Sequence, residues 1–140
     1  MSTYTVAGVT GVTLANLAAV NSYVATLPAS VTDSAAEIQA IVNATNKLAG
    51  IADAISNTGT ALTSADLAAL GVADLSGPGS AAKLSLLNSV LDGLPFSAVD
   101  TPGELAALID IVNRIVASAM GEVVVPGLSP ADFAALGISG

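Results

Sequence analysis

Two stretches of this chain have nearly the same sequence, and the repeat narrows the possible architectures more than any other feature. "LTSADLAALGVAD" occupies residues 62–74 and "LSPADFAALGISG" occupies residues 128–140, at an offset of 66. A longer match places residues 21–48 over residues 88–115 without a gap, at an offset of 67. A fixed period of this size indicates that a supersecondary unit has been duplicated.

Each copy is expected to contain three helices. The first begins near Thr13 and again near Ser80, and its apolar residues recur at helical spacing, which predicts one buried face. These residues are Leu17, Val20, Val24 and Leu27 in the first copy and Leu84, Leu87, Leu91 and Leu94 in the second. The second helix is the longest, with an apolar stripe from Ile38 to Ile55 and from Leu105 to Val116.

Hydroxyl and carboxylate residues mark the starts of the second and third helices. The second opens with "SAAE" (34–37) and "TPGE" (101–104), both of the Ser/Thr-x-x-Glu capping-box form. The short third helix opens with "TSAD" (63–66) and "SPAD" (129–132). Each places a carboxylate in the first turn, where the helix dipole stabilises negative charge. The residues predicted to act as structural caps are Ser34, Glu37, Thr63, Asp66, Thr101, Glu104, Ser129 and Asp132.

The third helix is expected to end at a glycine in each copy. Gly71 and Gly137 follow its last apolar residue, where the left-handed conformation is needed. Its inward-facing residues are predicted to be Leu67 and Leu70 in the first copy and Phe133 and Leu136 in the second.

The predicted fold class is therefore all-α, with two tandem three-helix units at residues 1–75 and 76–140 and a period of about 67 residues. "SGPGS" (76–80) is a turn-rich joint too brief for a long linker, so the units are expected to touch. Stacked bundles and one continuous helical array both fit this pattern. "GEVVVPG" (121–127) has strand-like residues that are expected to cover an exposed helix face, although Pro126 argues against a central strand.

Composition excludes several classes of partner. The chain has 3 basic and 11 acidic residues, a net charge of −8 that repels nucleic-acid phosphates and anionic lipid. The opening residues contain no basic segment and no run of 18 apolar residues, so neither a signal peptide nor a membrane insertion is predicted. If the protein is secreted, its export signal is expected outside this chain.

No catalytic, cofactor-binding or metal-binding residue is predicted. Cysteine and histidine are absent, which removes thiol nucleophiles, the usual general base and the usual transition-metal ligands. The pairs Asp33 with Glu37 and Asp100 with Glu104 lie at helix starts, where acidic residues act as caps. Two pairs of asparagines at matching positions, Asn21 with Asn88 and Asn46 with Asn113, leave two interpretations open: they bond loop carbonyls or each other, or they line a ligand groove.

The two ends of the chain also match. "GISG" closes it at 137–140, whereas "GVTG" at 8–11 leads directly into "VTLANLAAVN". If the end of one copy met the start of another, the third helix would pass through this glycine-rich turn into a new first helix. Two interpretations stay open: the chain is an excerpt from a longer array, or separate chains dock head to tail. The candidate assembly interface is therefore Val9, Val12, Leu14, Leu136 and Ile138.

"LTSADLAALGV", "GVTGVTLANLAAVN" and "DTPGELAALIDIVN" resemble the tandem helical repeats of very large bacterial surface proteins, which are adhesin-like or form matrices. In helix count and size each unit is also loosely similar to the albumin-binding three-helix modules of Gram-positive surface proteins. No residues match the albumin-contacting face of those modules, so albumin binding is not inferred. The resemblance implies secretion or a cell-surface location, tandem repetition, and a role in spacing or adhesion.

Two functions from different classes follow from the sequence. The first is a non-catalytic structural repeat that assembles with copies of itself into a filament or layer. The alternative is a module that recognises a host or matrix protein through an exposed apolar helix face. Apolar surface left at the two ends would favour assembly, whereas a lateral patch would favour a protein ligand.

Overall fold

The computed structural model describes residues 2–56, 59–72 and 75–138, and the ordered elements in these ranges are helical. They are α1 (Ser2–Val6), α2 (Leu17–Thr26), η1 (Ala29–Val31), α3 (Ala35–Ile51), α4 (Ser64–Ala69), α5 (Ser80–Leu91), η2 (Phe96–Ala98), α6 (Pro102–Ala119) and α7 (Pro130–Ala135), where η denotes a 3-10 helix. Within the same ranges β pairing is limited to an isolated bridge between Asp53 and Pro95. The predicted all-α class is confirmed.

Matching elements of the two halves follow the order of the repeat. Helix α3 begins at Ala35 and α6 at Pro102, whereas α4 begins at Ser64 and α7 at Pro130. The tandem unit itself nevertheless stays a prediction. Helix α2 is an exception in length, because it begins at Leu17 and not near Thr13.

The late start of α2 has a local cause. The side chain of Asn16 accepts a hydrogen bond from the Thr13 backbone N–H (2.7 Å) and donates to the Gly11 carbonyl (2.8 Å). These bonds hold residues 11–16 in a turn. Asparagine side chains compete with helical backbone bonds in this way.

All four predicted caps form capping boxes. Thr63 and Asp66 illustrate the arrangement: the Thr63 hydroxyl accepts from the Asp66 N–H (3.3 Å), and the Asp66 carboxylate accepts from the Thr63 N–H (2.8 Å). The same reciprocal bonds begin α3, α6 and α7. Each box satisfies two backbone donors that the first turn would otherwise leave unpaired, which stabilises a helix start by about 1 kcal/mol.

The largest core cluster contains residues from both halves. It includes Tyr23, Leu48 and Leu67 from the first half and Leu91 and Ile109 from the second, all almost fully buried. Helix α3 makes its most extensive helix contact with α4, α5 with α6, and α3 also touches α5 and η2. The units 1–75 and 76–140 thus share one core, and the boundary between them stays a prediction.

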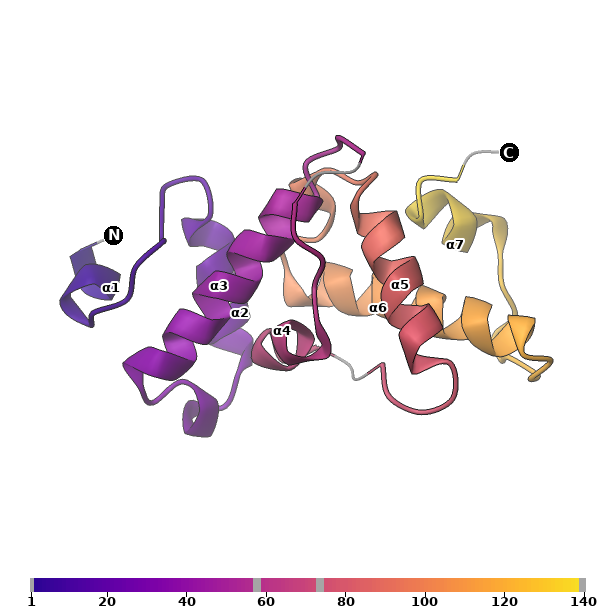
Figure 1. Cartoon of the computed structure of the whole chain (residues 1–140), viewed down its shortest axis with the longest axis horizontal. Helices are drawn as coiled ribbons and strands as arrows, with labels where there is room; N and C mark the ends of the chain where they lie inside the picture. The colour runs from indigo at the N-terminus through magenta and orange to yellow at the C-terminus, as the bar shows by residue number, and fades with distance from the viewer. Residues whose placement is uncertain (1, 57–58, 73–74, 139–140) are drawn as a thin grey trace.

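The molecule is elongated, with α1 at one end of its long axis and α7 at the other (Figure 1). Helix α4 lies between α3 and the second half, so in position it is internal (Figure 1). A small second cluster, formed by Val9, Val20 and Val42, lies near the α1 end. Among the described residues, no helix combines the length and the apolar character needed to cross a bilayer.

Two packing predictions were wrong. The loop 121–127 does not cover a helix face, because the side chains of Val123 and Val125 are 92% and 87% exposed. Phe133 was expected to face inward with Leu136, but Phe133 is 38% exposed while Leu136 is buried.

Candidate assembly interface

The contact between the two halves shows how such units join. Tyr23 on α2 is fully buried, and its hydroxyl donates to the carbonyl of Val99 at 2.8 Å in the second half. Burial, together with the nearby carboxylates of Asp100 and Glu104, raises the pKa of the Tyr23 hydroxyl, so it stays protonated and able to donate. Its hydrogen bond therefore ties the end of η2 to α2.

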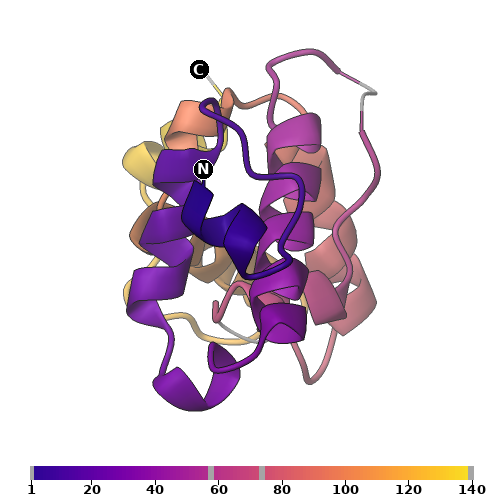
Figure 2. The ribbon, with the colours of Figure 1, turned by 90° about the vertical axis from the view of Figure 1, so that its left-hand side faces the viewer.

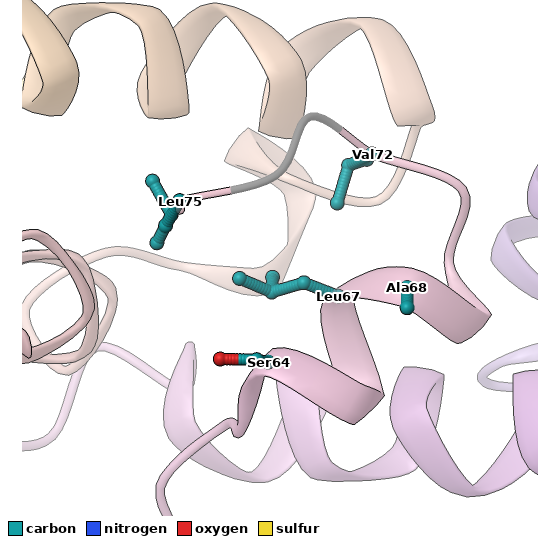
Figure 3. Close-up of a pocket in the computed structure, with 5 residues that line it drawn as sticks. All are labelled: Ser64, Leu67, Ala68, Val72 and Leu75. Atoms are coloured by element: carbon teal, nitrogen blue, oxygen red, sulfur yellow. The ribbon is translucent and has the colours of Figure 1, made fainter. Parts of the chain in front are cut away.

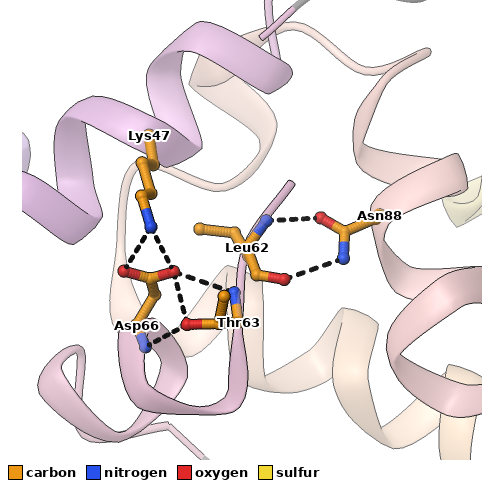
Figure 4. A network of polar contacts seen from close by, with 5 residues as sticks. All are labelled: Lys47, Leu62, Thr63, Asp66 and Asn88. Atoms are coloured by element: carbon orange, nitrogen blue, oxygen red, sulfur yellow. Dashed lines mark hydrogen bonds and ion pairs between the residues drawn. The ribbon is translucent and has the colours of Figure 1, made fainter. Parts of the chain in front are cut away.

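Asn88 on α5 makes the second polar contact between the halves (Figure 4). Its side-chain oxygen accepts from the Leu62 N–H (2.8 Å), and its side-chain nitrogen donates to the Leu62 carbonyl (3.1 Å). The nitrogen also donates to the Leu84 carbonyl one turn earlier in α5 (3.0 Å). Asn88 thus pairs with the backbone immediately before the N-cap of α4 and positions that helix.

A third contact is made by backbone alone. The Ala54 N–H donates to the Leu94 carbonyl (3.0 Å), next to the isolated bridge between Asp53 and Pro95. Ala54 has a positive φ of 61°, which turns the chain after α3 towards the second half. Together the three contacts pair backbone polar groups between the two halves, whose shared core is otherwise apolar.

An ion pair holds the third helix to the second in each half. Lys47 on α3 donates to both oxygens of Asp66 (3.1 and 2.9 Å), as Figure 4 shows. Arg114 on α6, which matches Lys47 in the repeat, donates to both oxygens of Asp132 (3.1 and 2.6 Å) and to Asp110 (2.9 Å). The carboxylates predicted only as caps therefore also bind basic side chains.

These bonds change the acidity of both carboxyl groups. Burial acts to raise the pKa of Asp66, but hydrogen bonds from Lys47 and Thr63 outweigh it, so the pKa lies below its ordinary value. Hydrogen bonds from Arg114 and Ser129 hold the pKa of Asp132 well below its usual range, and the same contact raises the pKa of Arg114. Both acids are thus charged at neutral pH.

A small apolar space of about 220 Å³ lies beside α4 (Figure 3). Leu67, Val72 and Leu75 point into it, and Ser64 and Ala68 complete its lining. Leu67 and Leu75 are buried, because the second half covers this face of α4. Ser64 and Ala68 are exposed, so the space opens to solvent on one side and is closed by Leu67 and Leu75 on the other.

The same face of α7 is open. A groove of about 350 Å³ is lined by Leu128, Ser129, Pro130, Phe133 and Ile138. Phe133 and Ile138 match Leu67 and Val72 in the repeat, yet they are 38% and 54% exposed. Leu67 and Val72 are therefore more deeply buried on the α4 segment than Phe133 and Ile138 are on the α7 segment.

The structure divides the predicted interface residues into two groups. Val9 and Leu136 are 3% and 6% exposed, because each packs into the chain's own core. Val12 is half-buried against the Val9 cluster. Leu14 and Ile138 are exposed, at 83% and 54%, and lie in different end segments of the chain.

Sequence reasoning missed several residues of this site. Phe133 was assigned to the core, although its replacement of Leu67 by a larger ring at the matching position was a usable signal. Tyr23 gave no local signal, since its partner Val99 lies 76 residues away. For the asparagines, the loop-carbonyl interpretation is confirmed at Asn88 and at Asn46, whose side chain donates to the Gly11 carbonyl (3.1 Å).

Within the described ranges, no group of three or more acidic side chains is arranged to hold a metal ion. Comparison of the chain with protein-family models, with curated proteins and with solved structures finds no match.

Proposed function

We propose that this chain is a non-catalytic structural repeat that assembles end to end with copies of itself, and that it serves in spacing, layer or filament formation, or adhesion. The carrying observation is the exposed groove on α7, because the matching apolar residues Leu62 and Leu67 are almost fully buried and Leu62 is bonded to the following half. Burying a face of this kind is favourable by roughly 25 cal/mol per Å² of apolar surface. The internal joint therefore supplies a template for a joint between chains.

The distribution of exposed apolar side chains supports end-to-end assembly over the alternative. Val6 and Leu14 belong to the segment around α1, whereas Val123, Val125, Phe133 and Ile138 belong to the loop before α7 and to α7 and its end. These two segments lie at opposite ends of the long axis (Figure 1). Apolar surface at both ends is what a stacking repeat needs.

A module that binds a host or matrix protein would need a lateral apolar helix face. The exposed apolar residues away from the two end segments include Val31 and Ile55, which lie beyond opposite ends of α3. A helix of the length of α3 spans about 26 Å, so these two side chains do not form one patch. The protein-ligand hypothesis therefore has less support.

The remaining parts of the proposal rest on sequence. A non-catalytic role follows from the absence of histidine and cysteine and from the use of Glu37, Asp66, Glu104 and Asp132 in helix caps. A secreted or cell-surface bacterial location follows from the resemblance of the repeats.

Light scattering on the whole chain tests the proposal. We expect the mean mass to rise with protein concentration, and Phe133→Asp to abolish the rise because it places a charge in the apolar groove. Val31→Asp, which puts the same charge on an exposed valine of η1, is the matched control and should assemble like wild type. A wild-type chain that stays monomeric at all concentrations, with or without changes to its N-terminal segment, would overturn the proposal.

A further inference from the structure

Helix α1 shares its sequence pattern with α4 and α7. "TYTVAGV" at 3–9 aligns with "DLAALGV" at 66–72 and with "DFAALGI" at 132–138. The alignment places Tyr4 with Leu67 and Phe133, Gly8 with Gly71 and Gly137, and Val9 with Val72 and Ile138. Aromatic or large apolar residues thus precede each glycine by the same four positions.

The backbone of the three segments ends in the same way. The glycines have φ values of 80°, 66° and 76°, in the left-handed region. The N–H that follows each glycine donates to the carbonyl five residues earlier: Val9 to Tyr4 (2.9 Å), Val72 to Leu67 (3.3 Å) and Ile138 to Phe133 (3.0 Å). This is the bond of a helix-terminating Schellman motif. Helix α1 is therefore a third, shorter version of the α4 and α7 element.

Helix α1 also packs on α2 and α3 at positions that match the surroundings of α4 in the second half. The Tyr4 hydroxyl donates to the side-chain oxygen of Asn21 on α2 (2.6 Å), and Asn21 corresponds to Asn88 on α5, which holds the segment before α4. Val9 packs against Val20 and Val42, whose counterparts in the second half are the core residues Leu87 and Ile109. Figure 2 shows α1 lying in front of α2 and α3 at this end.

The α7 segment has the same pattern of apolar residues, but these residues do not pack on a following helix pair as those of α1 and α4 do. In the part of the chain that the structure describes, no asparagine binds the Leu128 backbone as Asn88 binds the backbone of the matching residue, Leu62. Phe133 and Ile138, the counterparts of Tyr4 and Val9, are exposed. The exposed face of α7 in one copy is thus complementary to the surface of α2 and α3 in another copy. In each copy, α1 already covers that surface of α2 and α3.

We propose that α1 is an exchangeable plug: α7 of a second copy displaces it from α2 and α3. Phe133 and Ile138 then take the places of Tyr4 and Val9, and Asn21 pairs with the Leu128 backbone of the incoming chain. This inference rests on the proposed end-to-end assembly and adds how that assembly is limited. Helix α1 has five residues and no acidic residue in its first turn, whereas α7 begins with a capping box, so α7 is the better-formed helix.

The plug predicts that loosening α1 strengthens assembly. We expect Val9→Ser, which removes the buried anchor of α1, to lower the concentration needed for association about tenfold, an effect readily seen by light scattering. Val6→Ser makes the same chemical change at the last residue of α1, where the side chain is 89% exposed, and it should leave association at the wild-type level. Phe133→Asp added to Val9→Ser should return the chain to a monomer.

Circular dichroism and melting separate loss of the plug from loss of the fold. If Val9→Ser lowers helicity by more than the few residues of α1, Tyr4→Phe is used instead, because it removes only the bond to Asn21. A wild-type chain that assembles, with Val9→Ser and Tyr4→Phe leaving its association unchanged or weaker, overturns the plug and leaves the proposed function standing. Monomers for wild type and for both plug variants overturn the proposed function as well.

Discussion

Asp66 and Asp132 each close a capping box and bind a basic side chain of the preceding long helix. A carboxylate can cap a helix without forming an ion pair, because the cap requires only proximity to the backbone of the first turn. Joining them in one carboxylate makes the start of the short helix dependent on its attachment to the long one. A helix of six residues has little stability of its own, and this coupling explains how it persists.

The lowered pKa values give acid sensitivity with a defined direction. An acid with a folded-state pKa below its unfolded value stabilises the fold above the unfolded pKa, near 3.9 for aspartate, and loses that contribution as pH falls through the folded pKa. We therefore expect the free energy of unfolding to fall below about pH 4. Asp66→Asn should lower stability by about 1 kcal/mol at pH 7 and make the acid limb shallower.

Urea titrations between neutral and strongly acidic pH measure this effect. Glu122→Gln also removes one carboxylate, from an exposed position after α6, and serves as the control for the loss of one negative charge. An Asp66→Asn protein that loses stability with acid as steeply as wild type would show that the pair with Lys47 does not set the acid limb.

Among the elements, the short helices differ in how tightly their terminating glycines are enclosed. A Cβ added to Gly71 would lie 2.3 Å from the Leu27 side chain, whereas one added to Gly137 would meet Leu94 only at 3.9 Å. Both glycines have positive φ, so alanine costs about 1 to 2 kcal/mol at either position. The additional overlap with the Leu27 side chain makes the Gly71 position more sensitive.

We expect Gly71→Ala to destabilise the protein by at least about 1 kcal/mol more than Gly137→Ala, since Leu27 must shift within a packed core. Chemical denaturation of the two variants beside wild type measures the difference. Equal losses would mean that the Leu27 side chain yields freely to the added methyl group.

Local signals predicted the elements better than they predicted the contacts between them. The caps depend on residues three positions apart, so "SAAE" or "SPAD" contains the whole interaction. The bond from Tyr23 to Val99 spans 76 residues and has no counterpart in a local pattern. Helix α1 was missed because "TYTVAG" lacks a cap and a carboxylate, and the positions that it shares with "DLAALG" are few until the hydrogen bond that closes each helix is compared.

At the scale of the whole molecule, the joint between the halves is buried as thoroughly as the interior of either. Tyr23 and Leu62 are almost fully buried, and both contact the other half. A unit separated at residue 75 would expose these residues. The stability of each half thus depends on the other. In an assembly of copies, each added unit would likewise cover a face that the previous unit exposes.

Interdependence predicts a single unfolding transition for the 140-residue chain, with equal calorimetric and van't Hoff enthalpies. Tyr23→Phe leaves the Val99 carbonyl without its buried donor and should cost about 1 to 3 kcal/mol while keeping one transition. Tyr4→Phe, which removes a less buried hydroxyl that binds only α1 to α2, is the comparison and should lower the free energy of global unfolding by less than Tyr23→Phe does. Two resolved transitions, or a Tyr23→Phe loss confined to one of them, would mean that the halves unfold separately. In that event the joint would be a contact between independent bundles and a poor template for assembly between chains.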